Sequence, residues 1–162
     1  LQRYTAMCAA AIHKSGSKVT VSSGSAAIKW GSDSCPGCDG NMWSNANLQK
    51  QFNDPMAFLD IYQVHYYEWI NQYFSNPFEK SPIDYGINDR PVLVGEMPGR
   101  EGIIGFPTTM YELFENMYKL GYCGHFPWTS NSAGEGDFGS LKTFGEAALK
   151  FSTIHAEVIV KR

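Results

Sequence analysis

The stretch that most constrains this chain is residues 90–99, Arg-Pro-Val-Leu-Val-Gly-Glu-Met-Pro-Gly, in which a short apolar strand ends in a glutamate. Val92 to Val94 are aliphatic and largely β-branched, a pattern that favours a buried strand of a parallel sheet. Such sheets carry their chemistry at the carboxyl ends of the strands, which is where Glu96 lies. Because a buried carboxylate without a partner costs free energy, Glu96 is predicted to have a partner or a catalytic role.

Three further segments have the β-branched and aromatic composition of strands. They are residues 18–23, 60–64 and 121–126. The middle segment runs into His65, Tyr67 and Trp69, and the last one runs into Trp128. Strands with polar or aromatic ends, separated by segments of helix and loop length, are typical of a repeated β/α fold.

Helices are predicted around these strands from apolar residues that recur at helical spacing. They cover residues 6–13, 110–120 and about 140–153. Thr108 or Thr109 is expected to cap the middle helix, and Gly121 is expected to end it. The sequence therefore predicts an α/β chain in which four strands of a parallel sheet alternate with helices.

The ordered set of strand ends resembles strands five to eight of the (β/α)8-barrel glycoside hydrolases of the family 5 cellulase and mannanase type. The matching runs are Val-Thr-Val-Ser-Ser at 19–23, Asp-Ile-Tyr-Gln-Val-His-Tyr-Tyr at 60–67, Arg-Pro-Val-Leu-Val-Gly-Glu at 90–96 and Gly-Tyr-Cys-Gly-His-Phe-Pro-Trp at 121–128. The resemblance covers nearly the whole chain. It implies a TIM-type (β/α) repeat limited to strands five to eight, with residues 1–162 forming a single C-terminal half of the barrel domain.

The length of the chain sets a limit on this resemblance. A complete barrel needs roughly 250 residues, whereas the chain has 162. It is therefore expected to be a fragment or a natural half-barrel. Four strands alone would leave two open sheet edges and an apolar interior, so a segment or second chain that supplies the N-terminal half is the expected partner.

The resemblance also implies catalytic roles for three residues at the strand ends. Glu96 matches the nucleophile of a retaining hydrolase, the carboxylate that attacks the anomeric carbon of the sugar. His65 and Tyr67 would lie beside it, and the Tyr67 hydroxyl would hold the Glu96 carboxylate in the correct rotation. The implied substrate is a β-1,4-linked glucan or mannan, bound as a polysaccharide or oligosaccharide.

Aromatic side chains make up 14% of the residues, a share that suits a polysaccharide groove. Trp128 is expected to form a platform under the sugar, because the apolar C–H faces of sugar rings pack on aromatic rings. Trp30 and Trp69 also follow predicted strand ends and are candidates for substrate binding. Packing in the core or in loops is the alternative for both.

The second carboxyl group of a retaining mechanism is missing from the pattern. In the family that the chain resembles, the general acid/base is a glutamate that follows an asparagine at the end of strand four, and no Asn-Glu pair occurs in this sequence. The acid/base is therefore expected outside this chain. The remaining candidates within it are Glu68, Glu101, Glu135 and Asp137, of which Glu68 is directed away from Tyr67 by strand alternation. A noncatalytic carbohydrate-binding or assembly-forming protein derived from such a hydrolase is the alternative function.

The cysteines favour an oxidising compartment. Cys35 and Cys38 are separated by two residues in a polar loop and lack the further ligands of a zinc site, so a loop-stapling disulfide is the preferred interpretation. This predicts an extracellular, secreted protein. Cys8 and Cys123 are expected to be isolated buried thiols.

Other function classes are disfavoured by the composition. A net charge of −3 without a basic cluster argues against a nucleic-acid partner, and no apolar run is long enough to span a membrane. His13 and His155 are expected on the surface, and His125 is expected to be a hydrogen-bonded packing residue. They form no ligand set with the scattered acids and no phosphate-binding loop is present, so neither a metal nor a cofactor is predicted.

Overall fold

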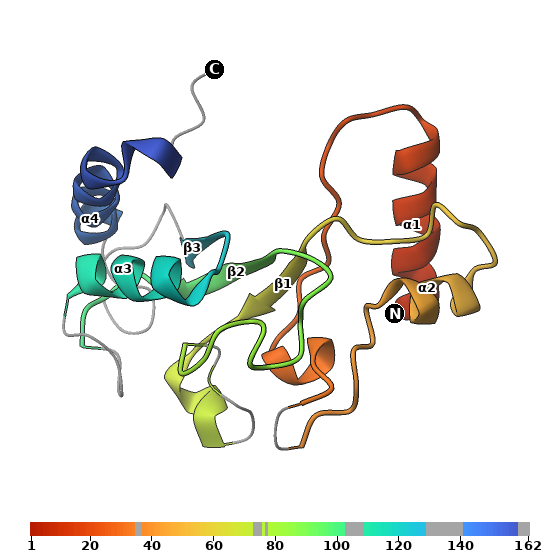
Figure 1. Cartoon of the computed structure of the whole chain (residues 1–162), viewed down its shortest axis with the longest axis horizontal. Coiled ribbons are helices and arrows are strands. Elements are labelled where there is room, and N and C mark those ends of the chain that lie inside the picture. The colour runs from red at the N-terminus through yellow and green to blue at the C-terminus, as the bar shows by residue number, and fades with distance from the viewer. Residues whose placement is uncertain (35–36, 73–75, 77, 103–108, 129–140, 159–162) are drawn as a thin grey trace.

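The computed structural model describes residues 1–34, 37–72, 76, 78–102, 109–128 and 141–158. Its elements, in chain order, are α1 (Gln2–Lys14), η1 (Ile28–Gly31), α2 (Asn45–Gln51), β1 (Tyr62–His65), η2 (Glu68–Gln72), β2 (Val92–Pro98), α3 (Met110–Leu120), β3 (Gly124–Trp128), α4 (Leu141–Ile154) and η3 (Ala156–Val158). The strands lie in the middle of the molecule, with α3 and α4 on one side and α1 and α2 on the other (Figure 1). None of the helices in these ranges is both long and apolar enough to cross a bilayer.

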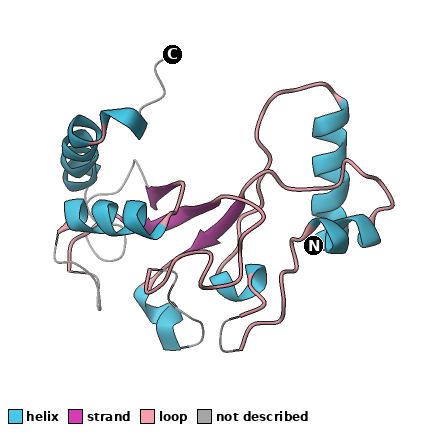
Figure 2. Ribbon diagram, in the orientation of Figure 1, coloured by secondary structure: helices cyan, strands magenta, loops and turns pink. Residues whose placement is uncertain are grey.

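The three strands form one parallel sheet in the order β1-β2-β3 (Figure 2). Neighbouring parallel strands need a crossover connection, and α3 lies on the crossover between β2 and β3. Sequential strands that pair as neighbours, joined by such crossovers, are the building unit of the predicted β/α repeat. The α/β prediction is confirmed in this form.

The prediction of a strand over residues 18–23 is wrong. The segment lies along the outer side of β1, where the Val21 carbonyl accepts a hydrogen bond from Asp60 N at 2.9 Å and the Ser25 carbonyl accepts one from His65 N at 2.7 Å. The Val21 amide donates to the Asp60 carboxylate at 2.8 Å instead of to a strand. Because a side chain replaces the backbone partner, no regular ladder forms, and the sheet of the described residues has three strands rather than four.

The boundaries of α3 agree with the predicted helix. Thr109 accepts a hydrogen bond from Glu112 N at 3.2 Å, and the Glu112 carboxylate accepts one from Thr109 N at 3.1 Å, so the two residues form a capping box. Gly121 ends the helix with a φ of 85°, a left-handed conformation that suits glycine. Leu113 and Met117 are buried on the face that packs inward.

The other helices agree less closely with prediction. The helix predicted over 6–13 is longer at both ends in α1, and α4 lies within about one residue of the predicted 140–153. The short helix α2 was not predicted, because its sequence, Asn-Ala-Asn-Leu-Gln-Lys-Gln, has a single large apolar residue. It begins at Ser44, whose hydroxyl accepts a hydrogen bond from Asn47 N at 3.3 Å.

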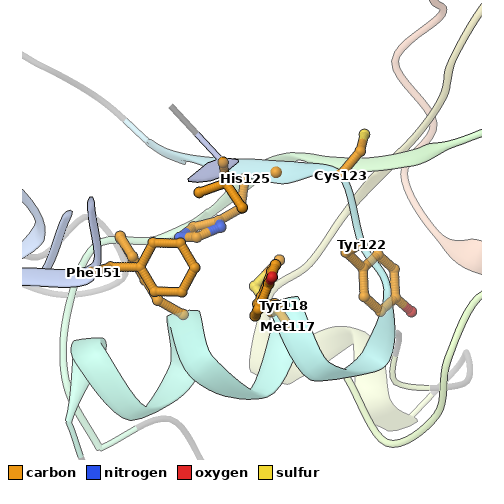
Figure 3. A pocket seen from close by; sticks show the side chains of 9 residues that line it. Met117, Tyr118, Tyr122, Cys123, His125 and Phe151 are labelled. Carbon is orange, nitrogen blue, oxygen red and sulfur yellow. The ribbon is translucent and has the colours of Figure 1, made fainter. Parts of the chain in front are cut away.

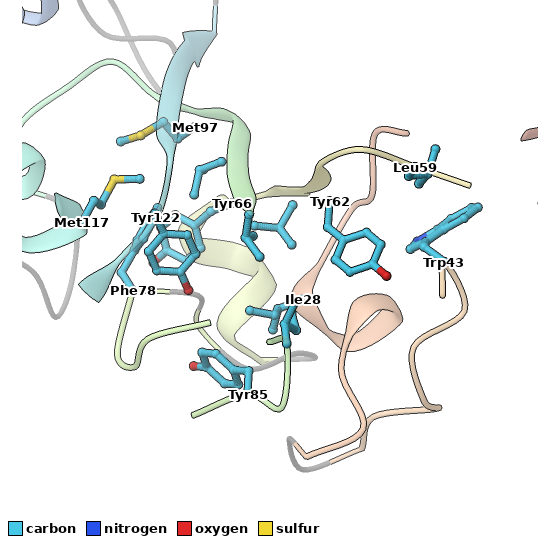
Figure 4. Packing of buried hydrophobic residues seen from close by; sticks show 14 of the residues in the cluster. Ile28, Trp43, Leu59, Tyr62, Tyr66, Phe78, Tyr85, Met97, Met117 and Tyr122 are labelled. Atoms are coloured by element: carbon cyan, nitrogen blue, oxygen red, sulfur yellow. The ribbon is translucent and has the colours of Figure 1, made fainter. Parts of the chain in front are cut away.

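One main core joins the sheet to the helices and loops (Figure 4). Val92 and Val94 of β2 and Tyr62 and Val64 of β1 are buried on one face of the sheet. The largest fully buried side chains are Tyr62, Tyr66, Ile28, Leu48, Leu59, Ile87, Met97, Met110, Leu113 and Met117. Because these come from segments along most of the chain, the packing ties both ends of the molecule to the same sheet.

Two histidines predicted on the surface are instead structural. The side chain of His13 is 8% exposed, with its Nδ1 2.9 Å from the Met56 carbonyl oxygen and its Nε2 3.1 Å from the Asp60 carboxylate. His155, 18% exposed, lies with Nε2 2.7 Å from the Glu115 carboxylate. The error has a common cause, because each histidine lies at or just after the end of a helix that packs against another part of the chain.

The cysteine predictions have mixed outcomes. Cys8 and Cys123 are free thiols, as predicted, but neither is fully buried: Cys8 is half-buried, and Cys123 is exposed and directly precedes β3 instead of lying within it. The predicted bridge between Cys35 and Cys38 involves Cys35, which lies outside the described residues, so it stays a prediction.

The cap of α3 predicts a measurable contribution to stability. Removing the Thr109 hydroxyl in Thr109→Ala leaves Glu112 N without its side-chain acceptor, so the free energy of unfolding should fall by about 1 kcal/mol. Urea unfolding followed by circular dichroism measures this change. Thr20→Ala removes a hydroxyl from an exposed loop position and should change the free energy of unfolding by less than about 0.5 kcal/mol; equal losses in the two variants would contradict the capping role.

The contact of His155 with α3 predicts a pH-dependent stability. Its hydrogen bond with Glu115 raises the pKa of His155 above the ordinary 6.5, with partial burial opposing the shift and Glu157 adding to it. Hydrogen bonds from Tyr111 and then His155 lower the pKa of Glu115 below 4.5. The histidine's contribution is therefore complete below its unfolded pKa and is lost as the pH rises through the raised folded value. The carboxylate's contribution is present above its unfolded pKa and is lost as the pH falls.

His155→Gln should accordingly destabilise the chain more at about pH 6 than at about pH 9, because the ion pair exists only while the histidine is charged. Thermal unfolding of both proteins at the two pH values measures the difference. The neighbouring exposed residue gives a control, Ile154→Ala, whose effect should be the same at both pH values. A His155→Gln effect that does not change with pH would show that this ion pair does not contribute to folding.

Candidate active site

A register shift between β1 and β2 decides which face of the sheet Glu96 occupies. Val64 pairs with Val94, but the next residue, His65, pairs with Glu96, so Gly95 is an extra residue in β2. A bulge of this kind changes the face to which the following side chains point. Strict alternation would have placed Glu96 on the buried face of Val94. With the bulge, Glu96 lies on the same face as His65.

Each oxygen of the Glu96 carboxylate has a neighbour from the end of β1. The Tyr67 hydroxyl donates a hydrogen bond to Oε1 at 2.7 Å, and His65 Nδ1 lies 3.4 Å from Oε2. The side chains of His65 and Glu96 are 27% and 21% exposed, so solvent reaches a carboxylate that is held from two sides. The structure thus brings together the three residues predicted as catalytic, and the geometry suits a carboxylate whose rotation is restrained.

Two of the three predicted sugar-binding tryptophans lie at the same end of the sheet. Trp69 in η2 is 55% exposed, and its ring stacks on Tyr67 with 6.3 Å between centroids and 14° between planes. Trp128 is the last residue of β3, is 43% exposed and pairs in register with Pro98 of β2. Exposed indole rings beside a carboxylate are suited to the apolar faces of a sugar.

Trp30 lies in a different environment. It is half-buried in η1 against the core, with the Lys29 ammonium 4.8 Å from its ring centroid. It also lines an open apolar pocket of about 390 Å³ with Leu1, Gln2, Met42 and Trp43. This pocket is not lined by Glu96, His65 or Tyr67, so the structure does not bring Trp30 together with them.

The other carboxylates considered as acid/base have separate structural roles or lie outside the described residues. Glu68 is the first residue of η2 and forms an ion pair with Arg100, so the strand alternation that was expected to direct it away from Tyr67 does not apply to it. Glu101 is exposed and accepts a hydrogen bond from Met110 N at 3.3 Å at the start of α3. Glu135 and Asp137 lie outside the part of the chain that is described.

A pocket of about 270 Å³ lies on the helix-covered face of the sheet, between α3, β3 and α4 (Figure 3). The His125 ring forms one wall and meets Phe114 edge-on, with 4.0 Å between ring centroids. Burial lowers the pKa of His125 to about 4. The residue packs as predicted, but its Nε2 has no hydrogen-bond partner in the described part of the chain, which corrects the expectation that it would be hydrogen-bonded. The pocket shares no residue with the carboxylate site.

Sequence reasoning missed one residue of the site, Gln63. It lies two residues before His65 in β1, and its Oε1 is 3.4 Å from His65 Nε2. Period-two alternation from His65 would have identified it as a neighbour on the same face. Within the described ranges, no group of three or more histidine, cysteine, aspartate and glutamate side chains could hold a metal ion.

Comparisons with known proteins give a consistent result, although no protein-family model matches the chain. The chain is 30% identical over 146 residues to a mannan endo-1,4-β-mannosidase from Cryptopygus antarcticus, a match that covers 86% of this chain and 36% of the relative. Its structure is similar to the β-mannanase of the blue mussel Mytilus edulis, with a TM-score of 0.77, 29% identity, and coverage of 98% of this chain and 42% of that one.

The endo-1,4-β-mannanase of Eisenia fetida gives a TM-score of 0.75 with 26% identity, covering 93% of this chain and 40% of that one. The chain therefore spans about two fifths or less of the length of these relatives. These similarities confirm the resemblance carried by the strand ends: over most of its length, the chain is similar to one part of the (β/α)8 glycoside hydrolases of the cellulase and mannanase type.

Proposed function

We propose that this chain carries the nucleophile side of the active site of a retaining endo-β-1,4-mannanase. The observation that supports this most directly is the Glu96 carboxylate at the end of β2, which lies between the Tyr67 hydroxyl at 2.7 Å and the His65 ring at 3.4 Å. Mannan is preferred over glucan as the substrate because the relatives described above are named as mannanases.

The chemistry assigned to Glu96 is attack on the anomeric carbon. The Tyr67 hydroxyl donates to Oε1 and restrains the carboxylate, while the partly exposed side chain leaves a path for the sugar. Trp128 and Trp69 extend this surface on either side with exposed indole rings. Trp30 is left out of this surface, because it lines a separate pocket.

In this mechanism the acid/base belongs to a residue outside this chain. A retaining hydrolase needs its two carboxyl groups about 5 to 5.5 Å apart, and the two described alternatives, Glu68 and Glu101, are engaged elsewhere. We therefore propose that residues 1–162 form the C-terminal half of the barrel, with β1, β2 and β3 as its strands six to eight, and that an N-terminal half supplies the missing glutamate. The modest share of each relative that the chain covers supports this division.

The proposed substrate and the predicted loop disulfide at Cys35 and Cys38 both suit an extracellular protein. The second candidate function is a noncatalytic carbohydrate-binding or assembly protein that retains the same surface. It is favoured by the lack of an assigned acid/base among the described carboxylates. The two functions differ in one step, the formation of a covalent bond between Glu96 and a sugar.

That step can be tested without the missing half. In a 2,4-dinitrophenyl 2-deoxy-2-fluoro-β-mannobioside, the bond from the anomeric carbon to the phenolic oxygen breaks as Glu96 forms its own bond to that carbon. Dinitrophenolate leaves with the electron pair and needs no proton, so the general acid is not required. We expect the chain to gain the mass of one fluoromannobiosyl group, located on Glu96 by peptide mapping.

Glu96→Gln should abolish this labelling, because an amide is a far weaker nucleophile, while Glu101→Gln, which alters an exposed carboxylate, should be labelled like the wild type. Intact-mass spectrometry of the folded proteins measures all three. A wild-type chain that binds the reagent without gaining mass would refute the nucleophile assignment and favour the noncatalytic function. Equal labelling of the wild type and Glu96→Gln would also refute the assignment.

The sugar platform predicts a loss of affinity in Trp128→Ala. Removing an exposed ring that stacks on a sugar should weaken binding of mannotetraose by roughly 1 kcal/mol, about a fivefold increase in Kd. Isothermal titration calorimetry measures the constants. The matched control is Trp30→Ala, which removes an indole from a separate pocket and should leave Kd unchanged; equal affinity of wild type and Trp128→Ala would exclude Trp128 from the binding surface.

A further inference from the structure

Gln63 and His65 lie side by side on one face of β1, between two glycines. A β-carbon on Gly95 would lie 2.5 Å from Cδ and 2.9 Å from Cγ of Gln63, distances too short for real contacts. A β-carbon on Gly24 would lie 3.4 Å from His65 Nε2 and 3.8 Å from Gln63 Oε1. The glutamine side chain therefore occupies the space that a larger residue at 95 would fill, and Gly24 borders the pair.

Space, and not backbone conformation, explains the glycine at position 95. Gly95 is absent from the glycines with positive φ in the described ranges, so its backbone is open to any residue. It is also the extra residue of the bulge that turns Glu96 toward His65. One residue thus serves two purposes: it turns the carboxylate to this face and leaves room for the Gln63 amide beneath the histidine.

The amide of Gln63 is held at both ends. Its Nε2 donates a hydrogen bond to the Ser22 hydroxyl at 2.8 Å, which directs Oε1 toward His65 Nε2 at 3.4 Å. The other ring nitrogen of His65, Nδ1, faces the Glu96 carboxylate at 3.4 Å. The four side chains form a continuous series from an exposed loop to the proposed nucleophile.

From this arrangement we infer that Gln63 is a positioning residue, which fixes the ring of His65 and through it the orientation of the Glu96 carboxylate. The inference rests on the proposed function of Glu96. The Gln63 oxygen accepts a hydrogen bond from Nε2 when that nitrogen carries the proton, and this contact opposes turning of the ring, since a flipped ring would present carbon atoms to both Gln63 and Glu96. Gln63 does not touch the reacting atoms, so its effect should be on turnover and not on sugar affinity.

The experiment uses ¹⁵N-labelled chain and long-range ¹H–¹⁵N NMR of the histidine rings. The chain has four histidines, and the signals of His65 are identified as those missing in His65→Gln. In the wild type, we expect Nε2 of His65 at the shift of a protonated ring nitrogen. In Gln63→Leu, which removes the acceptor at similar volume, this signal should move toward the shift of an unprotonated ring nitrogen, because the Glu96 carboxylate beside Nδ1 still favours a proton on that side of the ring.

Two further variants test the contact between Ser22 and Gln63 and control for the chemical change. Ser22→Ala alters only an exposed loop residue, so it should fold normally and shift the His65 signal in the same direction by a smaller amount. Gln51→Leu makes the same chemical change at an exposed position at the end of α2 and should leave the signal in place. Unchanged His65 signals in both folded Gln63→Leu and Ser22→Ala would overturn the inference.

Measurements of kcat and KM distinguish a failure of this inference from a failure of the proposed function. In protein that hydrolyses soluble mannan, Gln63→Leu should lower kcat on the order of tenfold with KM little changed, because a slightly misplaced carboxylate reacts more slowly. A wild-type protein that lacks both labelling at Glu96 and hydrolysis would refute the proposed function, while the NMR result would still decide whether Gln63 orients His65. Normal labelling at Glu96 with unshifted His65 signals would refute the role of Gln63 alone.

Discussion

The constraint on which the candidate site depends is the single extra residue in β2. Gly95 breaks the alternation that buries Val92 and Val94 against the helices, and Glu96 consequently pairs with His65 on the opposite face. A carboxylate on the helix-covered face would lie among apolar side chains, where its desolvation would be unfavourable. The bulge places it instead beside a hydroxyl and an imidazole with access to solvent. The restraint from Tyr67 and the proposed role of Gln63 both follow from this one change of direction.

The rest of the fold serves to hold the ends of β1 and β2 in register. On one side, α3 begins at its capping box and packs Leu113 and Met117 against the sheet, and His155 ties the end of α4 to α3. On the other side, His13 joins α1 to Asp60, two residues before the start of β1. The Asp60 carboxylate also accepts a hydrogen bond from the Val21 amide. One carboxylate therefore contacts both α1 and the loop beside β1. Ion pairs and caps at the periphery thus support a site to which they contribute no atoms.

The described site contains one of the two carboxyl groups that retaining hydrolysis needs. This agrees with the coverage of the mannanases, of which the chain spans about two fifths or less. One carboxylate, its two neighbours and the exposed indole rings of Trp69 and Trp128 lie at the carboxyl ends of the strands. Retaining hydrolysis needs a second carboxyl group across the sugar. The residues present can hold and orient a nucleophile and offer apolar rings to a sugar. Proton donation is the part of the chemistry that the proposal assigns to another segment.

The sequence by itself determined the local features, because caps, helical spacing and branched residues act over a few positions. It predicted α3 with its limits and the parallel strands that became β1, β2 and β3, and the family resemblance of the strand ends implied the set of Glu96, His65 and Tyr67. It also suggested a strand over 18–23, where the Asp60 side chain takes the place of a backbone partner. Only the tertiary structure decided the register of β1 against β2 and the burial of His13 and His155. Each of these depends on contacts between residues far apart in the chain, and alternation within one strand contains no information about an extra residue relative to its neighbour.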